Sequence, residues 1–137
     1  MKYGEIIIEK KECDLLKEII SMAHYHKDPT YRGSIEKLNR ELKNAKIVGQ
    51  NEMPDDVIRF NSIANIEMPE SINKSYQVVI PEKSDLSKGK ISVLAPLGLA
   101  LFGYAKGDEL DWQFPTGVKT IKILDVVQES KSKTEEV

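Results

Sequence analysis

The segment Lys90–Phe114, KISVLAPLGLALFGYAKGDELDWQF, constrains the fold of this chain more than any other part of the sequence. Its apolar, β-rich start at Ile91–Leu94 is typical of a short buried strand. Pro96 removes a backbone donor and fixes φ, so we expect the strand to end before it and a helix to begin there. Gly103 suits the position after a helix, where φ is often positive. The segment therefore predicts a strand, a short helix over 97–102, a turn at Gly107-Asp108 and a second strand over 109–114.

Composition excludes several classes of protein. The 137 residues, 40% hydrophobic and 31% charged, are typical of a soluble globular chain of one domain or two small ones. The apolar run Ile6–Ile8 is far shorter than the ~20 residues of a membrane span, and a single cysteine, Cys13, cannot form a disulfide framework. We therefore expect a cytoplasmic protein without a membrane partner. The net charge of −2 and an acidic second half favour a protein partner over direct binding of nucleic acid.

Residues 12–46 carry the pattern of two short helices. Apolar residues recur at three-and-four spacing from about Glu12 to Lys27, and Asp28-Pro29-Thr30 then favours a turn. A second repeat has the spacing of a coiled-coil seam: Tyr31, Ile35, Leu38, Leu42 and Ala45. Two helices joined by a short loop predict an antiparallel helical hairpin with coiled-coil packing.

The tip of this hairpin comprises Lys27, Asp28, Tyr31 and Arg32. One carboxylate beside two cations is a poor site for Mg²⁺, which prefers several oxygen ligands. The two histidines, His24 and His26, point apart on a helix and do not supply the convergent ligands that zinc needs. We therefore predict no metal and no cofactor.

After Gly49 the pattern changes to short β-branched or alternating runs, which are typical of strands. These runs cover 57–60, 63–66, 76–80, 91–94, 110–114 and 118–126. We predict that Val118, Ile121 and Ile123 face a core, and that 71–74 and 84–89 are loops. The predicted organisation is α+β: a lead-in and hairpin over 1–48, an antiparallel sheet with one short helix over 49–128, and a disordered tail over 129–137.

Three motifs in the second half carry a resemblance to a known family. Ile91-Ser92-Val93, a small residue, Pro96 and the later Gly107-Asp108-Glu109 resemble the C-terminal domain of the Gre transcript-cleavage factors, GreA and GreB. Met53-Pro54-Asp55-Asp56-Val57 with Asn61-Ser62 is most similar, within that superfamily, to the regulators of nucleoside diphosphate kinase (Rnk). Pro115-Thr116-Gly117 departs mildly from that pattern, which has glycine at the second place. The resemblance is strong over residues 49–127 and weak before them.

The resemblance implies an FKBP-like fold and a non-catalytic transcription regulator. Such a protein would bind RNA polymerase near its secondary channel, compete with Gre factors, and touch nucleic acid only through the polymerase. The positions that match the family's docking segment are Ala95, Pro96, Leu97, Gly98, Leu99 and Ala100. We expect Pro96, Leu97 and Gly98 to face outward and Leu101 and Phe102 inward, in a monomer.

Other functions stay open at this point. An FKBP-like fold also suggests prolyl isomerisation in a pocket of Phe102, Tyr104, Trp112 and Phe114, or a general protein-binding module. An active transcript-cleavage factor is a further alternative. The acidic trio Asp108, Glu109 and Asp111 fits a turn and an exposed strand better than a catalytic pair. The sequence leaves open direct contact with DNA, the regulatory outcome, and any direct link to nucleoside diphosphate kinase.

Overall fold

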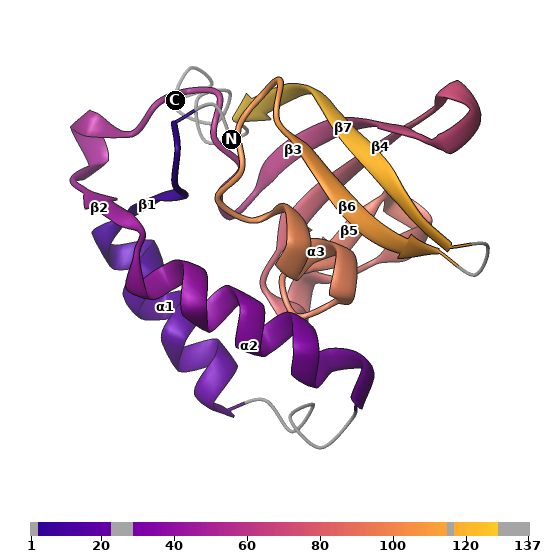
Figure 1. The fold of residues 1–137 in the computed structure, drawn as a ribbon. Coiled ribbons are helices and arrows are strands. Elements are labelled where there is room, and N and C mark those ends of the chain that lie inside the picture. The colour runs from indigo at the N-terminus through magenta and orange to yellow at the C-terminus, as the bar shows by residue number, and fades with distance from the viewer. Residues whose placement is uncertain (1–2, 23–28, 115–116, 129–137) are drawn as a thin grey trace.

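The computed structural model describes residues 3–22, 29–114 and 117–128, and for residues 29–34 and 113–114 it describes the backbone (Figure 1). The chain is α+β, as predicted. Its N-terminal part runs through four elements: β1 (Ile7–Glu9), α1 (Lys10–Met22), α2 (Pro29–Lys43) and β2 (Lys46–Val48). None of the described helices is long and apolar enough to cross a lipid bilayer.

A two-stranded parallel sheet joins the two ends of the helical segment. β1 leads directly into α1, α2 is followed almost at once by β2, and Ile8 pairs with Ile47. The first turn of α1 and the last turn of α2 are therefore held near one another, and the chain runs out along α1 and back along α2 (Figure 1). The predicted lead-in thus has a defined role as the first strand of this pair. Coiled-coil packing of the two helices stays a prediction.

Helix α1 begins two residues earlier than Glu12, because a side chain of β1 caps it. Glu9 accepts hydrogen bonds from the backbone N–H groups of Lys11 (2.9 Å) and Glu12 (3.1 Å), which have no partner within the helix. The apolar spacing predicted for the second helix is confirmed by burial, whereas that of the first is confirmed in part, because Leu15 and Met22 are exposed. The buried side chains are Cys13, Leu16 and Ile20 on α1, and Ile35, Leu38 and Leu42 on α2.

The second part of the chain forms a five-stranded sheet in the order β5-β4-β3-β7-β6. Its strands are β3 (Ser62–Met68), β4 (Ile72–Val79), β5 (Lys90–Ser92), β6 (Glu109–Phe114) and β7 (Gly117–Gln128), and α3 (Pro96–Leu101) follows β5. The prediction of a purely antiparallel sheet is wrong, because β4 and β5 are parallel. Parallel neighbours need a crossover, and residues 80–89 supply it with two short 3₁₀ turns, Pro81–Lys83 and Leu86–Lys88.

Three local predictions differ from the structure. Residues 57–60 form no strand; Val57 makes an isolated bridge with Ala105, and Ile58 donates to the carbonyl of Tyr104 (2.8 Å). Residues 72–74 belong to β4 rather than to a loop, because β3 and β4 stay paired up to a three-residue turn over 69–71. Val118 is 64% exposed, because it lies an odd number of residues before the buried Ile121 and so faces the other side of the sheet.

One hydrophobic cluster spans both parts of the chain. It contains Ile6 and Ile8 from the lead-in together with buried residues of α1, α2, α3 and the sheet. At Gly103 the lead-in approaches the body so closely that an added Cβ would lie 3.0 Å from the Cβ of Ile6. The domain boundary at residues 48–49 stays a prediction, and the core continues across it.

Candidate docking helix and polar joint

The predicted succession of strand, helix, turn and strand is confirmed in the segment 90–114. After β5 the chain turns at Ser92, whose carbonyl accepts from Ala95 N (2.9 Å) and whose hydroxyl accepts from Leu94 N (3.0 Å). Pro96 occupies the first turn of α3, where its missing N–H has no helical partner to lose. Gly103 then takes φ of 86°, as expected for a residue that follows a helix.

The structure divides the six predicted docking residues into two groups. Ala95, Pro96, Leu97 and Ala100 are partly exposed. The outward orientation predicted for Gly98 is wrong, and Leu99 is also buried. A Cβ at Gly98 would lie 2.2 Å from the carbonyl oxygen of Ser92, so the helix packs directly on the end of β5. Glycine is needed at this position for that close approach.

Leu101 and Phe102 face inward, as predicted, and both are fully buried. Of the four aromatics suggested for an isomerase pocket, Phe102 and Tyr104 are core residues, and Trp112 is only partly buried against the core. Phe102 also packs edge-on against Phe60 with ring centroids 5.0 Å apart. The side chain of Phe114 is outside the described residues.

The predicted hairpin tip cannot be assembled from the described residues. Lys27 and Asp28 lie outside them, as do His24 and His26, whereas Tyr31 and Arg32 belong to α2 and have a described backbone only. Among the described side chains no group of three or more His, Cys, Asp or Glu residues could hold a metal ion. The role of the tip stays a prediction.

The acidic trio is arranged as a turn and a strand edge. Asp108 is buried, and its carboxylate accepts from the backbone N–H of Ala105 (2.8 Å), which stabilises the turn before β6. Glu109 and Asp111 are exposed on β6, and Asp111 accepts from the hydroxyl of Thr120 at 3.4 Å. Asp108 therefore has a structural role in the turn chemistry that its position suggested.

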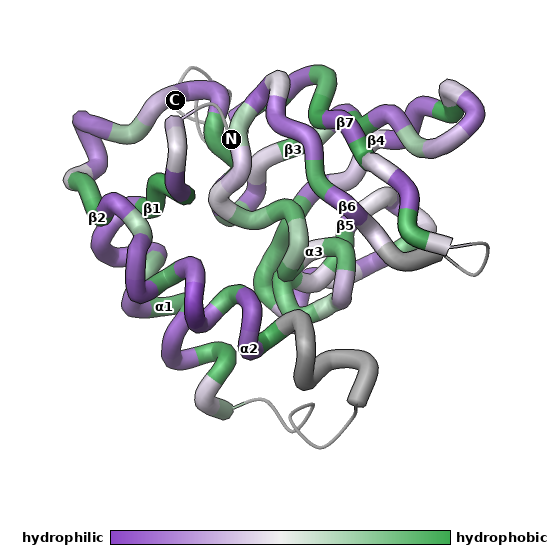
Figure 2. The backbone as a smooth tube through the Cα atoms, viewed as in Figure 1, coloured by the Kyte–Doolittle hydropathy of each residue, from purple (hydrophilic) through white to green (hydrophobic). Residues whose placement is uncertain are grey.

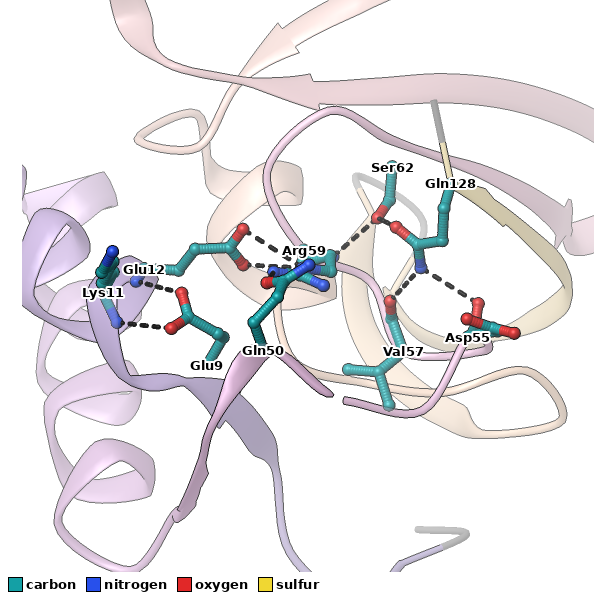
Figure 3. Close-up of polar contacts among 9 residues, drawn as sticks. All are labelled: Glu9, Lys11, Glu12, Gln50, Asp55, Val57, Arg59, Ser62 and Gln128. Carbon is teal, nitrogen blue, oxygen red and sulfur yellow. Dashed lines mark hydrogen bonds and ion pairs between the residues drawn. The ribbon is translucent and has the colours of Figure 1, made fainter. Parts of the chain in front are cut away.

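A group of hydrogen bonds around Arg59, which we call the polar joint, connects α1 to the second part of the chain (Figure 3). Sequence reasoning missed it. Arg59 Nε donates to both carboxylate oxygens of Glu12, at 3.0 and 3.1 Å, and Arg59 Nη2 donates to Gln50 Oε1 at 2.7 Å. The side chains of Arg59 and Glu12 are only 12% and 18% exposed. Burial raises the pKa of Glu12, and the hydrogen bond and charge of Arg59 oppose that rise.

The family motif at Asn61-Ser62 continues this joint toward the end of β7. Asn61 adopts φ of 71°, a left-handed conformation that asparagine tolerates better than most residues. Ser62 Oγ accepts from the backbone N–H of Arg59 (2.9 Å) and donates to Gln128 Oε1 (2.7 Å). The motif therefore fixes the start of β3 against the last residue of β7.

The family motif at residues 53–57 is hydrogen-bonded to the same residue, Gln128. Gln128 Nε2 donates to the backbone carbonyls of Val57 (2.7 Å) and Asp55 (3.0 Å), as Figure 3 shows. Both motifs thus serve to hold the loop before β3 and the end of β7 together. Their spacing in the sequence indicated a family, but the partner that unites them, Gln128, lies far away in the chain.

A second contact joins α2 to the loop after α3. The hydroxyl of Tyr104 donates to Glu41 Oε2 at 3.0 Å, and the ring is buried. Burial, together with the negative charge of Glu41, raises the pKa of Tyr104, so its proton is held firmly in this hydrogen bond. Besides the shared hydrophobic cluster, polar contacts at Arg59 and at Tyr104 therefore attach the hairpin to the body.

Comparisons with known proteins agree with these motifs. The family model for "Transcription elongation factor, GreA/GreB, C-term" matches residues 53–128. A transcription elongation factor GreA from Syntrophus aciditrophicus (strain SB) is 29% identical over 123 residues, which cover 89% of this chain and 76% of that protein. A regulator of nucleoside diphosphate kinase from Escherichia coli (strain K12) is 34% identical over 102 residues, which cover 72% and 75%.

A solved structure shares the fold. The prokaryotic transcription elongation factor GreA/GreB from Nitrosomonas europaea superposes with a TM-score of 0.73 at 30% identity, over 90% of this chain and 98% of that one. The likeness to both GreA and the nucleoside diphosphate kinase regulators, inferred from short motifs, is thus confirmed over most of the chain. The chain belongs to the GreA/GreB family of transcription elongation factors.

Proposed function

We propose that this protein is a non-catalytic transcription regulator that binds RNA polymerase near its secondary channel and competes there with Gre factors. The observation that carries the proposal is the family match over residues 53–128, which includes α3 and all five strands of the larger sheet. Relatives over most of the chain are named as transcription elongation factors and as regulators of nucleoside diphosphate kinase. We assign the docking contact to the C-terminal part, because this is the region that the family model covers.

The docking contact centres on the partly exposed face of α3. Ala95, Pro96, Leu97 and Ala100 offer a small apolar surface, while Gly98 and Leu99 are buried beneath it. Pro96 limits the backbone at the start of the helix, and Gly98 packs on Ser92. A surface already held in one conformation loses little entropy when it binds, which favours affinity.

Two finer structural assignments belong to the same proposal. We assign the sheet and α3 to an FKBP-like fold, because a twisted mixed sheet packs on one short helix. We assign α1 and α2 to a short coiled coil, because Ile35, Leu38 and Leu42 keep the seam spacing and are buried. Both assignments follow the family resemblance.

The absence of cleavage chemistry is also part of the proposal. It is supported by the sequence of the hairpin tip, where Asp28 is flanked by Lys27 and Arg32 and no second carboxylate is present. Metal-assisted hydrolysis of a phosphodiester needs more oxygen ligands than this. At saturating concentration the protein should therefore not shorten nascent RNA in a backtracked elongation complex with Mg²⁺, and shortening would show that it is a cleavage factor.

A direct test is a pull-down of the full chain with core RNA polymerase, with and without a Gre factor. We expect retention of the protein by polymerase and its progressive release as the Gre factor is added. Retention that a Gre factor does not reduce would place the contact elsewhere on the polymerase. No retention at micromolar concentrations of both partners would refute the proposed function.

A further inference from the structure

Each helix of the hairpin presents one carboxylate to the body of the protein. Glu12, in the first turn of α1, accepts hydrogen bonds at both carboxylate oxygens from Arg59 Nε, at 3.0 and 3.1 Å. Glu41, near the end of α2, accepts from the hydroxyl of Tyr104 at 3.0 Å. Arg59 precedes β3 and Tyr104 follows α3, so the two donors come from separate parts of the body. We call these two contacts the carboxylate pins.

The strength of the attachment does not account for the pins. The side chains of Arg59 and Glu12 are 12% and 18% exposed, and Tyr104 is 7% exposed, so all three are largely removed from water. Removing a charged pair from water costs about as much free energy as the attraction between the charges returns. Apolar side chains of similar size would therefore hold the hairpin to the body as firmly, which indicates that the pins contribute something other than stability.

Apolar contacts already join the hairpin to the body. One hydrophobic cluster contains Leu16 of α1 and Leu38 of α2 together with Leu101 of α3 and Ile121 of β7. In Figure 2 the mostly hydrophobic segment around α3 lies beside α2, which α3 contacts. Burial of apolar surface is non-directional, so it favours close packing without selecting one angle between the packed parts. A hydrogen bond, in contrast, weakens steeply when its length or angle departs from the preferred geometry.

From this division of roles we infer that the carboxylate pins set the direction of the hairpin, so that α1 and α2 keep one orientation relative to the body in the free protein. Two pins on different helices allow rotation only about the line that joins them, and the packing of α2 against α3 opposes that rotation. The inference goes beyond the proposed function and does not depend on it, because it concerns the protein alone.

The position of the pins gives them control over the far end of the hairpin. Both lie close to the β1–β2 pair, since Glu12 follows β1 by three residues and Glu41 precedes β2 by five. The 13 residues of α1 extend about 20 Å from this base. A change of about 10° in the direction of α1 would therefore move its end by roughly 3 Å. Small freedom at the pins becomes a large displacement at the far end.

Distances between two spin labels measure this orientation in the full-length protein. One label is attached at Lys37→Cys on α2 and the other at Glu109→Cys on β6, both exposed positions, with Cys13→Ala to remove the buried native thiol. A reference pair, Lys88→Cys with Glu109→Cys, spans the five-stranded sheet and gives the width that the labels themselves contribute. We expect a single maximum for the hairpin pair, with a width no more than about 1.5 times that of the reference.

A variant without pins separates direction from stability. Glu12→Leu/Arg59→Met/Glu41→Met/Tyr104→Phe replaces both pins with apolar side chains and should melt within about 5 °C of the wild type or above it. Its hairpin distribution should be at least about twofold broader, or its maximum displaced by more than about 3 Å, while the reference pair is unchanged. Tyr104→Phe alone removes one hydroxyl from an otherwise intact ring, and it should broaden the distribution by less.

The matched control is Glu12→Gln/Glu41→Gln, which keeps an acceptor oxygen at each pin and should retain the narrow distribution. Two maxima or a broad distribution in the wild type would overturn the inference. A distribution equal to that of the wild type, in either the variant without pins or Tyr104→Phe, would overturn it as well. If the variant without pins melts more than about 5 °C below the wild type or does not fold, the pins act through stability, which also contradicts the inference.

Discussion

The guanidinium of Arg59 and the carboxylate of Glu12 form a nearly buried pair, with 3.0 Å between Nε and Oε1, across 47 positions of sequence. Glu12 belongs to the first turns of α1, and Arg59 lies in the loop before β3. The pair therefore joins the hairpin to the body of the protein. It also ties that attachment to the family motif, because the backbone N–H of Arg59 donates to Ser62.

Removing Arg59 should destabilise the protein markedly. In Arg59→Met the Glu12 carboxylate loses its cation while it remains largely buried, and we expect a loss of about 2 kcal/mol in the free energy of unfolding. Lys106→Met is the matched control, because Lys106 pairs with Asp125 at 3.6 Å on the surface, with side chains 55% and 49% exposed. That change should cost less than about 0.5 kcal/mol. Urea unfolding of both variants measures the difference, and equal losses would contradict the buried-pair argument.

Glu12 should also make stability depend on pH. Its pKa is raised above the ordinary value of 4.5, chiefly by burial, so the folded state holds its proton more tightly than the unfolded state does. That contribution to stability is fully present below pH 4.5 and is lost as the pH rises through the higher pKa of the folded protein. Glu12→Gln removes this titration. Its stability relative to wild type should therefore increase between about pH 4 and about pH 7, and a decrease over that range would reverse the assignment.

Two glycines test how closely the lead-in packs on the body. Gly103 and Gly107 have φ of 86° and 90°, so alanine at either position is strained by about 1 kcal/mol. Only at Gly103 does the new Cβ also meet a side chain, that of Ile6, at 3.0 Å. Gly103→Ala should therefore cost about 1 kcal/mol more than Gly107→Ala. Melting temperatures of the two variants give the comparison, and equal costs would mean that Ile6 moves aside freely.

The face of α3 is tested by two leucines on the same helix. Leu97 is partly exposed, whereas Leu101 is fully buried. Leu97→Glu should lower the unfolding free energy by only about 1 kcal/mol, yet abolish retention by polymerase, because the carboxylate would be desolvated without a partner in the complex. Leu101→Glu should unfold the protein. If Leu97→Glu is folded and binds polymerase normally, α3 does not make the contact.

Local patterns explain what the sequence could predict. Pro96, Gly103 and Gly107 each act on the backbone of their own neighbourhood, so the order of strand, helix, turn and strand could be predicted without knowing anything else about the fold. The buried stripes of α1 and α2 are local in the same sense. The parity error at Val118 was avoidable, since it stands three residues from Ile121 and alternation gives it the opposite face.

Other features depend on contacts that no local pattern reveals. The partners of Arg59 and Gln128 lie 47 and up to 73 positions away, so the polar joint could be seen only in the folded chain. The orientation of Gly98 was ambiguous because glycine serves equally in an exposed turn and in close packing against a backbone. The early start of β4 depends on Glu70 and Ser71, which adopt left-handed φ values of 67° and 61° without being glycines.

The parallel pairing of β1 with β2 also fixes the position of the two ends of the helical hairpin without fixing the hairpin's length. The start of α1 and the end of α2 are both held at the β1–β2 pair. Equal insertions in α1 and α2 would therefore lengthen the hairpin and leave Ile8 opposite Ile47. Seven residues added to each arm would lengthen it by about 10 Å and keep the apolar stripes in phase. An insertion of three or four residues in one helix alone would shift its buried apolar residues along the hairpin relative to those of the other helix. The β1–β2 pair thus sets where the two helices begin and end, and leaves their length to be set by the helices themselves.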